Sequence, residues 1–238
     1  MPMKRPKKFN RLTRFKTTGL VVVAAATIGG FLGISFKGNK PFYVPSYRAV
    51  RVIDGDTFIT AEDQNIRLAS SDAPELDRCG GQQAKKELEK LILNKDIYLK
   101  VVYRDSSRLM ALVYTEDGLV DEKMLASGWA EIHNREGVNG AQLTAAAEKA
   151  RQTKLGVFSD LCTQTVNPQH SDCRIKGNIK LNTAASQNAV EKTYYFPGCY
   201  SYDIVIVQLH KGDAWFCTEA EARQAGFTKA VNCPVSYK

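Results

Sequence analysis

Residues 52–75, VIDGDTFITAEDQNIRLASSDAPE, hold the strand and turn signals that decide the fold. From Tyr47 to Thr60 the sequence alternates and is rich in Val, Ile and Thr around an Asp-Gly dipeptide, which is typical of a strand or hairpin. Another strand-like run follows at Asn65–Ser71. Asp-Gly is common in tight turns of every kind, so the dipeptide alone predicts structure and not function.

Helix and strand patterns alternate after this stretch. Apolar residues at helical spacing predict helices, β-branched runs predict strands, and glycines mark two of the helix ends. The helices are expected at 79–93, 120–127 and 141–154, and two further strands at 97–103 and 109–114. Several short strands with three helices predict an α+β domain built on a small barrel.

A second segment, residues 166–238, is rich in cysteine and aromatic residues. It contains a β-like run at Asp203–Leu209 and a capping box, in which Thr218 is followed three residues later by Glu221. The capping box predicts a short helix at Glu219–Ala225. A unit of this size often depends on disulfides, so we expect a small disulfide-stapled α+β module.

The positive charge of the chain lies mostly at its N-terminus. The 238 residues carry a net charge of +8 with a mean hydropathy of −0.29, and the 44% apolar share excludes wholesale disorder. Residues 1–17 contain seven basic residues and no acid, whereas residues 47–165 have a net charge of −3 and residues 166–238 of +2. The basic balance is therefore not in itself a sign of nucleic-acid binding.

An uncharged stretch, GLVVVAAATIGGFLGISF at 19–36, follows the basic segment. This pattern is typical of a signal peptide or a signal anchor, and we favour an uncleaved anchor. We expect a cytoplasmic segment at 1–17, a transmembrane anchor at 18–36 and a linker at 37–46. The positive-inside rule then places the remainder outside the cell, anchored to the membrane, or secreted if the segment is cleaved.

All six cysteines follow the apolar stretch, in the compartment where disulfides persist. They are Cys79, Cys162, Cys173, Cys199, Cys217 and Cys233. An even number predicts a disulfide framework, although spacing alone does not choose among the possible connectivities. Zinc is disfavoured because no two of these cysteines have the close spacing of zinc ligands.

Carboxylates and arginines suited to phosphodiester hydrolysis occur in and after residues 52–75. Aspartate oxygens suit a hard cation such as Ca²⁺, a longer carboxylate can deprotonate water, and guanidinium groups match phosphate oxygens. We predict Asp56 and Asp72 as metal ligands, and Glu75 as the base. Arg67 and Arg108 are the predicted phosphate-binding pair. The three histidines have no ligand spacing and are expected to face solvent or lie in loops.

The chain resembles the staphylococcal nuclease (thermonuclease) family in five motifs that occur in the same order. These are Val52–Thr57 (VIDGDT), Ile66–Leu68 (IRL), Asp72–Glu75 (DAPE), Arg108–Tyr114 (RLMALVY) and Lys154–Phe158 (KLGVF). The resemblance implies a five-stranded OB-type barrel with three helices over residues 47–165. It also implies Ca²⁺-dependent cleavage of DNA and RNA to 3′-phosphate ends.

Carried over by position, the family's roles fall on six residues of this sequence. Asp56 and Asp72 correspond to the calcium carboxylates, and Ala73 to the residue that offers a backbone carbonyl. Glu75 corresponds to the general base, and Arg67 and Arg108 to the phosphate-binding pair. The family often has Thr where Ala73 stands, which a carbonyl ligand tolerates.

Further expectations concern the disulfides, the C-terminal segment and the substrates. Cys79 and Cys162 bracket the nuclease-like domain and are expected to pair, and we further predict Cys173 with Cys233 and Cys199 with Cys217. Residues 166–238 resemble a small cysteine-and-aromatic module of some bacterial proteins, for which no activity is implied. DNA and RNA are the expected substrates, with no obligate protein partner. The alternative is an OB-fold protein with weak catalysis that binds nucleic acid or the cell surface.

Overall fold

The computed structural model describes residues 47–104, 107–133, 140–182 and 189–237. Within them, no helix is long and apolar enough to cross a bilayer. The predicted basic segment at 1–17, anchor at 18–36 and linker at 37–46 lie outside the described residues, so they stay predictions.

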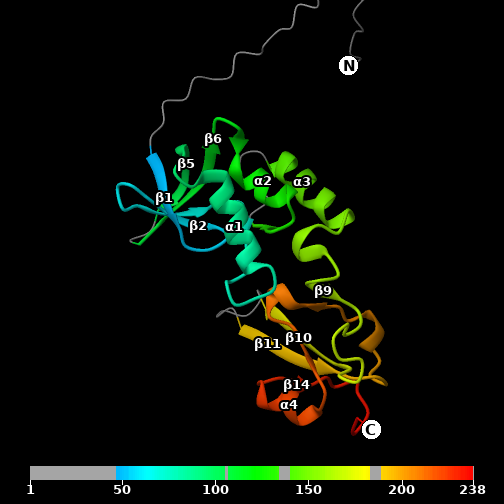
Figure 1. Ribbon diagram of the computed structural model, residues 1–238. Helices are drawn as coiled ribbons and strands as arrows, with labels where there is room; N and C mark the ends of the chain where they lie inside the picture. The colour runs from blue at the N-terminus through cyan, green and yellow to red at the C-terminus, as the bar shows by residue number, and fades with distance from the viewer. Residues whose placement is uncertain (1–46, 105–106, 134–139, 183–188, 238) are drawn as a thin grey trace, which may run out of the picture. The chain divides into compact units, whose positions relative to one another are not determined.

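Five strands close into a barrel that begins at Tyr47 (Figure 1). They are β1 (Tyr47–Val52), β2 (Thr57–Thr60), β3 (Asn65–Leu68), β5 (Asp96–Arg104) and β6 (Leu109–Thr115). Their order is β3-β2-β1-β5-β6, and the parallel pairing of β3 with β6 closes the ring. Closure removes the free strand edges. The two-residue strand β7 (Gly118–Leu119) continues the sheet beyond β6.

Three helices accompany the barrel: α1 (Gly81–Ile92), α2 (Val120–Ala126) and α3 (Gly140–Gln152). Helix α1 buries Ala84, Leu88 and Ile92, the positions that predicted it from their spacing. These side chains join the apolar residues of the strands in one core. The expected five-stranded barrel with three helices is confirmed.

Gly128 follows the end of α2, as the sequence predicts, whereas α3 ends at Gln152 and Gly156 begins the 3₁₀ turn η1 (Gly156–Phe158). Gly128 and Gly156 have φ values of +74° and +56°, a region that favours glycine. They also touch: the backbone N–H of Val157 donates to the carbonyl of Gly128 at 2.9 Å. A Cβ on Gly156 would lie 2.2 Å from the carbonyl oxygen of Gly128, and one on Gly128 would lie 2.4 Å from that of Leu155.

A four-stranded sheet forms the framework of the C-terminal residues, in the order β13-β10-β11-β14. Its strands are β10 (Ile175–Asn182), β11 (Ala189–Tyr195), β13 (Ala214–Phe216) and β14 (Thr228–Lys229), and helix α4 (Glu219–Gln224) precedes β14. Thr218 caps α4 by accepting a hydrogen bond from the backbone N–H of Glu221, as the capping box predicts. The expected disulfide-stapled α+β module is therefore present.

The disulfides join Cys79 to Cys162, Cys173 to Cys217, and Cys199 to Cys233. The first is the pair expected from the sequence. The other two differ from the predicted partners of Cys173 and Cys199. The physical reason is the sheet register: Ile175 of β10 lies opposite Phe216 of β13, which brings Cys173 beside Cys217.

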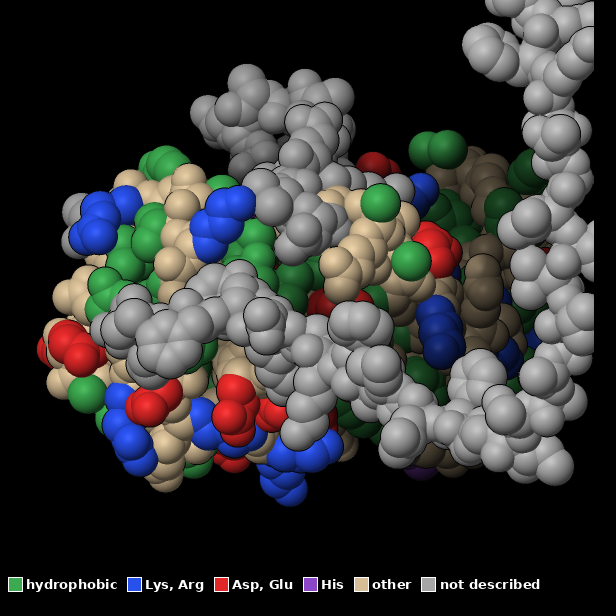
Figure 2. All heavy atoms as spheres, turned by 90° about the horizontal axis from the view of Figure 1, so that it is seen from above, with side chains coloured by type: hydrophobic (Ala, Val, Ile, Leu, Met, Phe, Trp, Pro, Cys, Tyr) green, Lys and Arg blue, Asp and Glu red, His purple; other side chains and the backbone are tan. Residues whose placement is uncertain are grey.

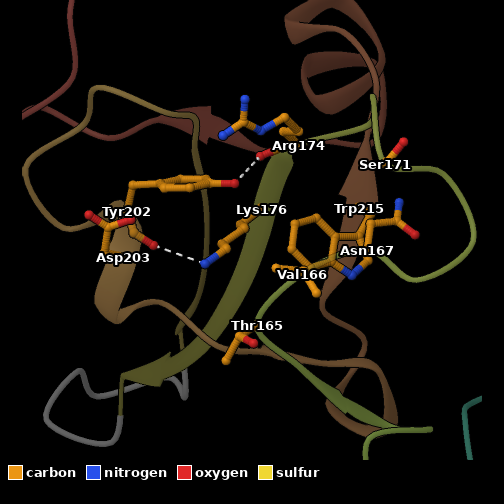
Figure 3. A pocket seen from close by; sticks show the side chains of 9 residues that line it. All are labelled: Thr165, Val166, Asn167, Ser171, Arg174, Lys176, Tyr202, Asp203 and Trp215. Carbon is orange, nitrogen blue, oxygen red and sulfur yellow. Dashed lines mark hydrogen bonds between the residues drawn. The ribbon is translucent and has the colours of Figure 1, made fainter.

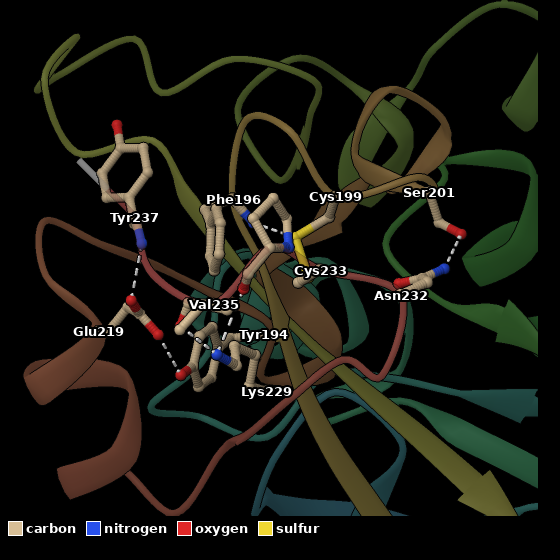
Figure 4. Close-up of a disulfide and its surroundings, with 11 residues drawn as sticks. Tyr194, Phe196, Cys199, Ser201, Glu219, Lys229, Asn232, Cys233, Val235 and Tyr237 are labelled. Atoms are coloured by element: carbon tan, nitrogen blue, oxygen red, sulfur yellow. Dashed lines mark hydrogen bonds between the residues drawn. A yellow bond between two sulfur atoms is a disulfide. The ribbon is translucent and has the colours of Figure 1, made fainter.

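The C-terminal tail is held by polar contacts near the Cys199–Cys233 disulfide (Figure 4). Glu219 accepts hydrogen bonds from the hydroxyl of Tyr194 and the backbone N–H of Tyr237, at 2.6 and 2.9 Å. The ammonium group of Lys229 donates to the carbonyls of Pro234 and Val235. These contacts fix the last turn of chain against the sheet.

The segment expected as a strand at Asp203–Leu209 is mostly not one. It forms two 3₁₀ turns, η2 (Tyr202–Ile204) and η3 (Leu209–Lys211), on either side of the two-residue strand β12 (Val207–Gln208). The carbonyls of Tyr202 and Val205 accept hydrogen bonds from the ammonium of Lys176, at 3.0 and 2.7 Å, rather than from a strand partner. The buried Lys176 thus donates hydrogen bonds to carbonyls that would otherwise accept from a neighbouring strand.

The two parts of the chain share a short sheet. Strand β9 (Thr163–Gln164) pairs with β12, and the indole N–H of Trp215 donates to the side chain of Gln164 at 2.8 Å. The described residues from Tyr47 to Tyr237 belong to one compact unit. The predicted division into 47–165 and 166–238 stays a prediction.

A buried carboxylate joins α2 to the barrel. Asp121 has no exposed surface and accepts hydrogen bonds from the backbone N–H groups of Ser70 and Val113, at 2.8 and 3.3 Å. Burial raises the pKa of Asp121 to about 6, against the lowering effect of these hydrogen bonds. The charged form of Asp121 is thus disfavoured in the folded protein.

We predict that Asp121 makes stability fall as the pH rises from about 4 to about 6. A carboxyl whose pKa is raised on folding favours the folded state below its unfolded pKa, and this contribution is lost as the pH passes the folded pKa. Urea unfolding of wild type and Asp121→Asn should show a stability difference that changes by up to about 3 kcal/mol over that range. The exposed-site control Asp160→Asn should show no such change, and a pH-independent difference for Asp121→Asn would contradict the prediction.

Candidate active site

Asp56 is a buried carboxylate at the start of the β1–β2 hairpin's second strand. Asp56 is only 2% exposed. Its carboxylate accepts hydrogen bonds from the hydroxyl of Thr57 at 2.8 Å and from the backbone N–H of Ala73 at 3.0 Å. Burial raises the pKa of Asp56 to about 6, although these donors and the charge of Arg67 oppose the rise. Burial thus disfavours the ionised form of Asp56.

Arg67 brings two of the predicted metal ligands together. It lies on β3, and its guanidinium pairs with the carboxylate of Asp56 at 2.8 Å and with that of Asp72. Asp72 ends the two-residue strand β4 (Ser71–Asp72) and is exposed. One guanidinium thus bridges a buried and an exposed carboxylate, which otherwise would repel each other.

Gly55 allows this cluster to be compact. A Cβ at this position would lie 2.5 Å from the Cβ atoms of both Ala73 and Ala84. The glycine is needed for close approach of the hairpin turn to the Ala73 loop and to α1, and its φ is not in the left-handed region. The sequence indicated a tight turn here but not this contact.

Glu75 lies on the loop between β4 and α1, which contains a hydrogen-bonded turn and ends near a disulfide. Glu75, Asp72 and Ala73 line one cavity of about 540 Å³. The carbonyl of Glu75 accepts a hydrogen bond from the backbone N–H of Arg78, and Cys79 is joined to Cys162. The predicted base is thus exposed beside the Asp72 end of the cluster.

Arg108 lies apart from this cavity. It precedes β6 and lines a cavity of about 230 Å³ together with Asn65 and Arg104. In the β3–β6 pairing Arg67 lies opposite Met110. Arg108 directly precedes β6, two residues before Met110. The structure therefore brings five predicted residues together and sets Arg108 at the neighbouring strand end.

Sequence reasoning missed a group on the strand beside Asp72. Glu131, on β8 (Glu131–Ile132), lies opposite Asp72 in the β4–β8 pairing. Its carboxylate pairs with the ammonium of Lys211 at 2.8 Å and lies 3.6 Å from the guanidinium of Arg151. Burial would raise the pKa of Glu131, but Lys211 and the adjacent His210 lower it to about 2. A two-residue strand leaves no periodic signal that could have indicated this arrangement.

His210 differs from the expectation that the histidines face solvent. It is 4% exposed, and its Nε2 lies 3.8 Å from the carboxylate of Glu131. Within the described part of the chain, neither ring nitrogen has a hydrogen-bond partner. Its position in the short turn η3, against Glu131, accounts for the burial.

The residues present suit a hard cation. No group of three or more His, Cys, Asp or Glu side chains with metal-site geometry occurs among the described residues. Asp56 and Asp72 supply two carboxylates, and Ala73 lies beside them with its backbone. An all-oxygen set of this size fits Ca²⁺, which takes its other ligands from water and substrate. A cation there would also favour the ionised form of the buried Asp56.

Comparison with known proteins identifies the family. The model for staphylococcal nuclease homologues matches residues 65–160. An uncharacterized endonuclease of Escherichia coli is 31% identical over 118 residues, which cover 48% of this chain and 76% of the relative. The chain belongs to the staphylococcal nuclease family. The matched range includes Arg67, Asp72, Ala73, Glu75 and Arg108, while Asp56 lies before it.

Other members of the family are similar over comparable or longer ranges. An uncharacterized endonuclease of Haemophilus influenzae is 30% identical over 118 residues, covering 48% of this chain and 66% of the relative. A thermonuclease of Staphylococcus hyicus is 26% identical over 167 residues, covering 60% of this chain and 98% of the relative. These names support a nuclease.

The C-terminal module has a cavity of its own, of about 540 Å³ (Figure 3). Tyr202, Lys176 and Trp215 line it. The ammonium of Lys176 lies 4.3 Å from the ring centre of Tyr202 and donates to two backbone carbonyls, so its donors are largely engaged within the protein. None of the six predicted site residues lines this cavity.

Charged side chains of both signs are interspersed on the face shown in Figure 2. Lysine and arginine side chains do not gather into one patch on the visible part of this face. This agrees with the net charge of −3 over residues 47–165. Phosphate binding on this face would therefore depend on individual Lys and Arg side chains and not on a broad basic surface.

Proposed function

We propose that this chain is an exported, calcium-dependent endonuclease that hydrolyses DNA and RNA to 3′-phosphate ends. The observation that carries the proposal is the bridge from Arg67 to Asp56 and Asp72, with Glu75 on the adjoining cavity wall. The resemblance to thermonucleases and the endonuclease names of the relatives support the reaction class. Calcium, held by Asp56, Asp72 and the carbonyl of Ala73, would offset charge on the phosphate.

Arginines bind and orient the phosphodiester in this proposal. Arg67 already presents its guanidinium at the carboxylate cluster, where its side chain is 24% exposed. Arg108 comes from the neighbouring strand end and contacts the phosphate from the second side. Two guanidinium groups can stabilise the charge that builds up on the phosphate oxygens in the transition state.

Glu75 accepts a proton from the attacking water. The water oxygen forms a bond to phosphorus, and the bond from phosphorus to the 5′ oxygen breaks. The 5′ oxygen leaves and takes up a proton, so the products are a 3′-phosphate and a 5′-hydroxyl. The exposed position of Glu75 on the cavity wall allows both water and substrate to reach it.

We expect Glu75→Gln to lower kcat on plasmid DNA and on RNA by about 10²–10⁴, because the proton acceptor is lost. Arg108→Ala should lower it by about 10²–10³ through loss of charge stabilisation. The purified chain is assayed with Ca²⁺ and with a chelator, and Glu62→Gln on an exposed loop is the matched control. Cutting that persists in the chelator, or a Glu75→Gln variant as fast as wild type, would refute the mechanism.

The same assay separates the alternative function. A protein with weak catalysis would bind labelled DNA or RNA without turnover under every metal condition. That alternative would be favoured if wild type binds the nucleic acid without cutting it and Glu75→Gln behaves in the same way.

We expect Ca²⁺ to raise the thermal midpoint of the folded protein. A ligand that binds only the folded state stabilises it by about 2.7 kcal/mol at 100 times its Kd. Asp72→Asn removes one exposed carboxylate and should abolish most of the calcium-dependent rise, whereas Asp160→Asn should keep it. A midpoint that Ca²⁺ leaves unchanged in wild type would count against the metal site.

Export is supported by the three disulfides, since disulfides persist in oxidising compartments. We expect a protease that cannot cross the membrane to degrade the nuclease domain of the chain on intact cells. Membrane-bound protein would indicate an anchor, and protein in the medium a cleaved signal. Protection on intact cells, together with thiols that react without a reductant, would contradict export.

A further inference from the structure

The cavity that contains Glu75 is built by both parts of the chain. Asp72, Ala73 and Glu75 line it together with residues of β10 and of η3. The module is part of the surroundings of the proposed reaction.

Three basic side chains from three separate segments line this cavity: Arg78, Lys180 and Lys211. Arg78 is on the same loop as Glu75, Lys180 is on β10, and Lys211 is in η3. Arg78 and Lys180 are exposed and have no ion-pair partner among the described residues, while Lys211 pairs with Glu131. Two unpaired cations thus stand beside the hydrolytic residues.

A buried carboxylate fixes the two segments of the module that line the cavity. Asp213 is 4% exposed and accepts hydrogen bonds from the backbone N–H groups of Ile179 and Gln208, at 2.7 and 2.9 Å. It also accepts one from the side chain of Asn178. The module wall is therefore held in place before any ligand arrives, which lowers the entropic cost of binding.

His210 supplies an independent sign of a ligand. It lines the same cavity and is 4% exposed; its Nε2 lies 3.8 Å from the carboxylate of Glu131, beyond hydrogen-bond distance, and its Nδ1 has no hydrogen-bond partner among the described residues. Buried polar groups are normally hydrogen-bonded. A phosphate or sugar oxygen in the cavity would satisfy one of these nitrogens.

The charge distribution indicates what the module adds. Residues 47–165 have a net charge of −3, and residues 166–238 have +2. Because the barrel part has a net negative charge, a polyanion is attracted mainly by individual cations such as Arg78 of the barrel part and Lys180 of the module, which both line this cavity. The half-buried Ile179 adds apolar lining against which a sugar or base can pack.

We propose that the C-terminal module forms one wall of the substrate cleft, where Arg78 and Lys180 bind phosphates of a single polynucleotide strand next to the bond that is cut. The inference rests on the proposed nuclease function and extends it to a second binding subsite. A volume of about 540 Å³ is in the range of a small-ligand pocket and suits one or two nucleotides of a single strand, not a duplex.

The test compares a long and a short substrate in an Arg78→Ala/Lys180→Ala double variant. The substrates are a single-stranded oligonucleotide of about 12 nucleotides and a dinucleotide. The ratio of kcat/KM on the long substrate to that on the short one should fall about tenfold. The control Lys86→Ala/Lys192→Ala makes the same charge change at two exposed lysines that do not line the cavity, and its ratio should equal that of wild type.

A binding measurement keeps the inference testable without catalysis. Fluorescence anisotropy with the labelled oligonucleotide in a chelator gives Kd as a function of salt. For a single strand each lost phosphate contact should lower the slope of log K against log salt by about 0.7, so the double variant should lose about 1.4. The control variant should keep the wild-type slope.

Each outcome decides one of the two claims. An active wild type with an unchanged substrate ratio and an unchanged salt slope in the Arg78→Ala/Lys180→Ala variant would overturn the cleft and leave the nuclease function standing. An inactive wild type would overturn the nuclease function, and the salt slope alone would then decide the cleft. Tighter binding of duplex than of single strand would also overturn the inference.

Discussion

The contact between Arg67 and the two aspartates holds the hydrolytic side of the barrel together. Asp56 directly precedes the buried strand β2 and Asp72 is the exposed end of β4, and their negative charges would repel each other without a cation between them. The guanidinium has fixed planar donors, so it can serve both carboxylates at once. The backbone N–H of Ala73 and the hydroxyl of Thr57 complete the shell of Asp56.

This arrangement extends to the C-terminal module through strand β8. Glu131 stands opposite Asp72, and Lys211 of the module holds its carboxylate. The module thereby contacts the strand pair that carries a proposed metal ligand. Its own polar anchors, Asp213 and Lys176, serve to fix its loops, which explains why a module with so few regular elements has a defined wall.

Local signals predicted the parts of the fold that depend on periodicity and turn chemistry. Alternation around Asp54-Gly55 predicted the first hairpin, and the spacing of Ala84 and Leu88 predicted α1. The pattern of carboxylates and arginines predicted the cluster around Arg67. These features depend on residues near one another in sequence, or on motifs with a fixed order.

Features that depend on long-range packing could not be predicted in this way. Asp121 is an acid in the first turn of a helix, a position typical of the surface, yet it is buried under two backbone donors. The partners of Cys173 and Cys199 depend on strand register, and the burial of His210 depends on a contact with Glu131 far away in sequence. Only the folded chain places these groups together.

The contact between Gly128 and Gly156 limits which residues can occupy these two positions. Each glycine occupies a backbone conformation that favours glycine, and the Cβ of any other residue at 156 would overlap the carbonyl of 128. A second substitution to a smaller side chain cannot relieve this overlap, because the atoms that the new Cβ would meet are backbone atoms. Both positions are therefore expected to remain glycine in related sequences.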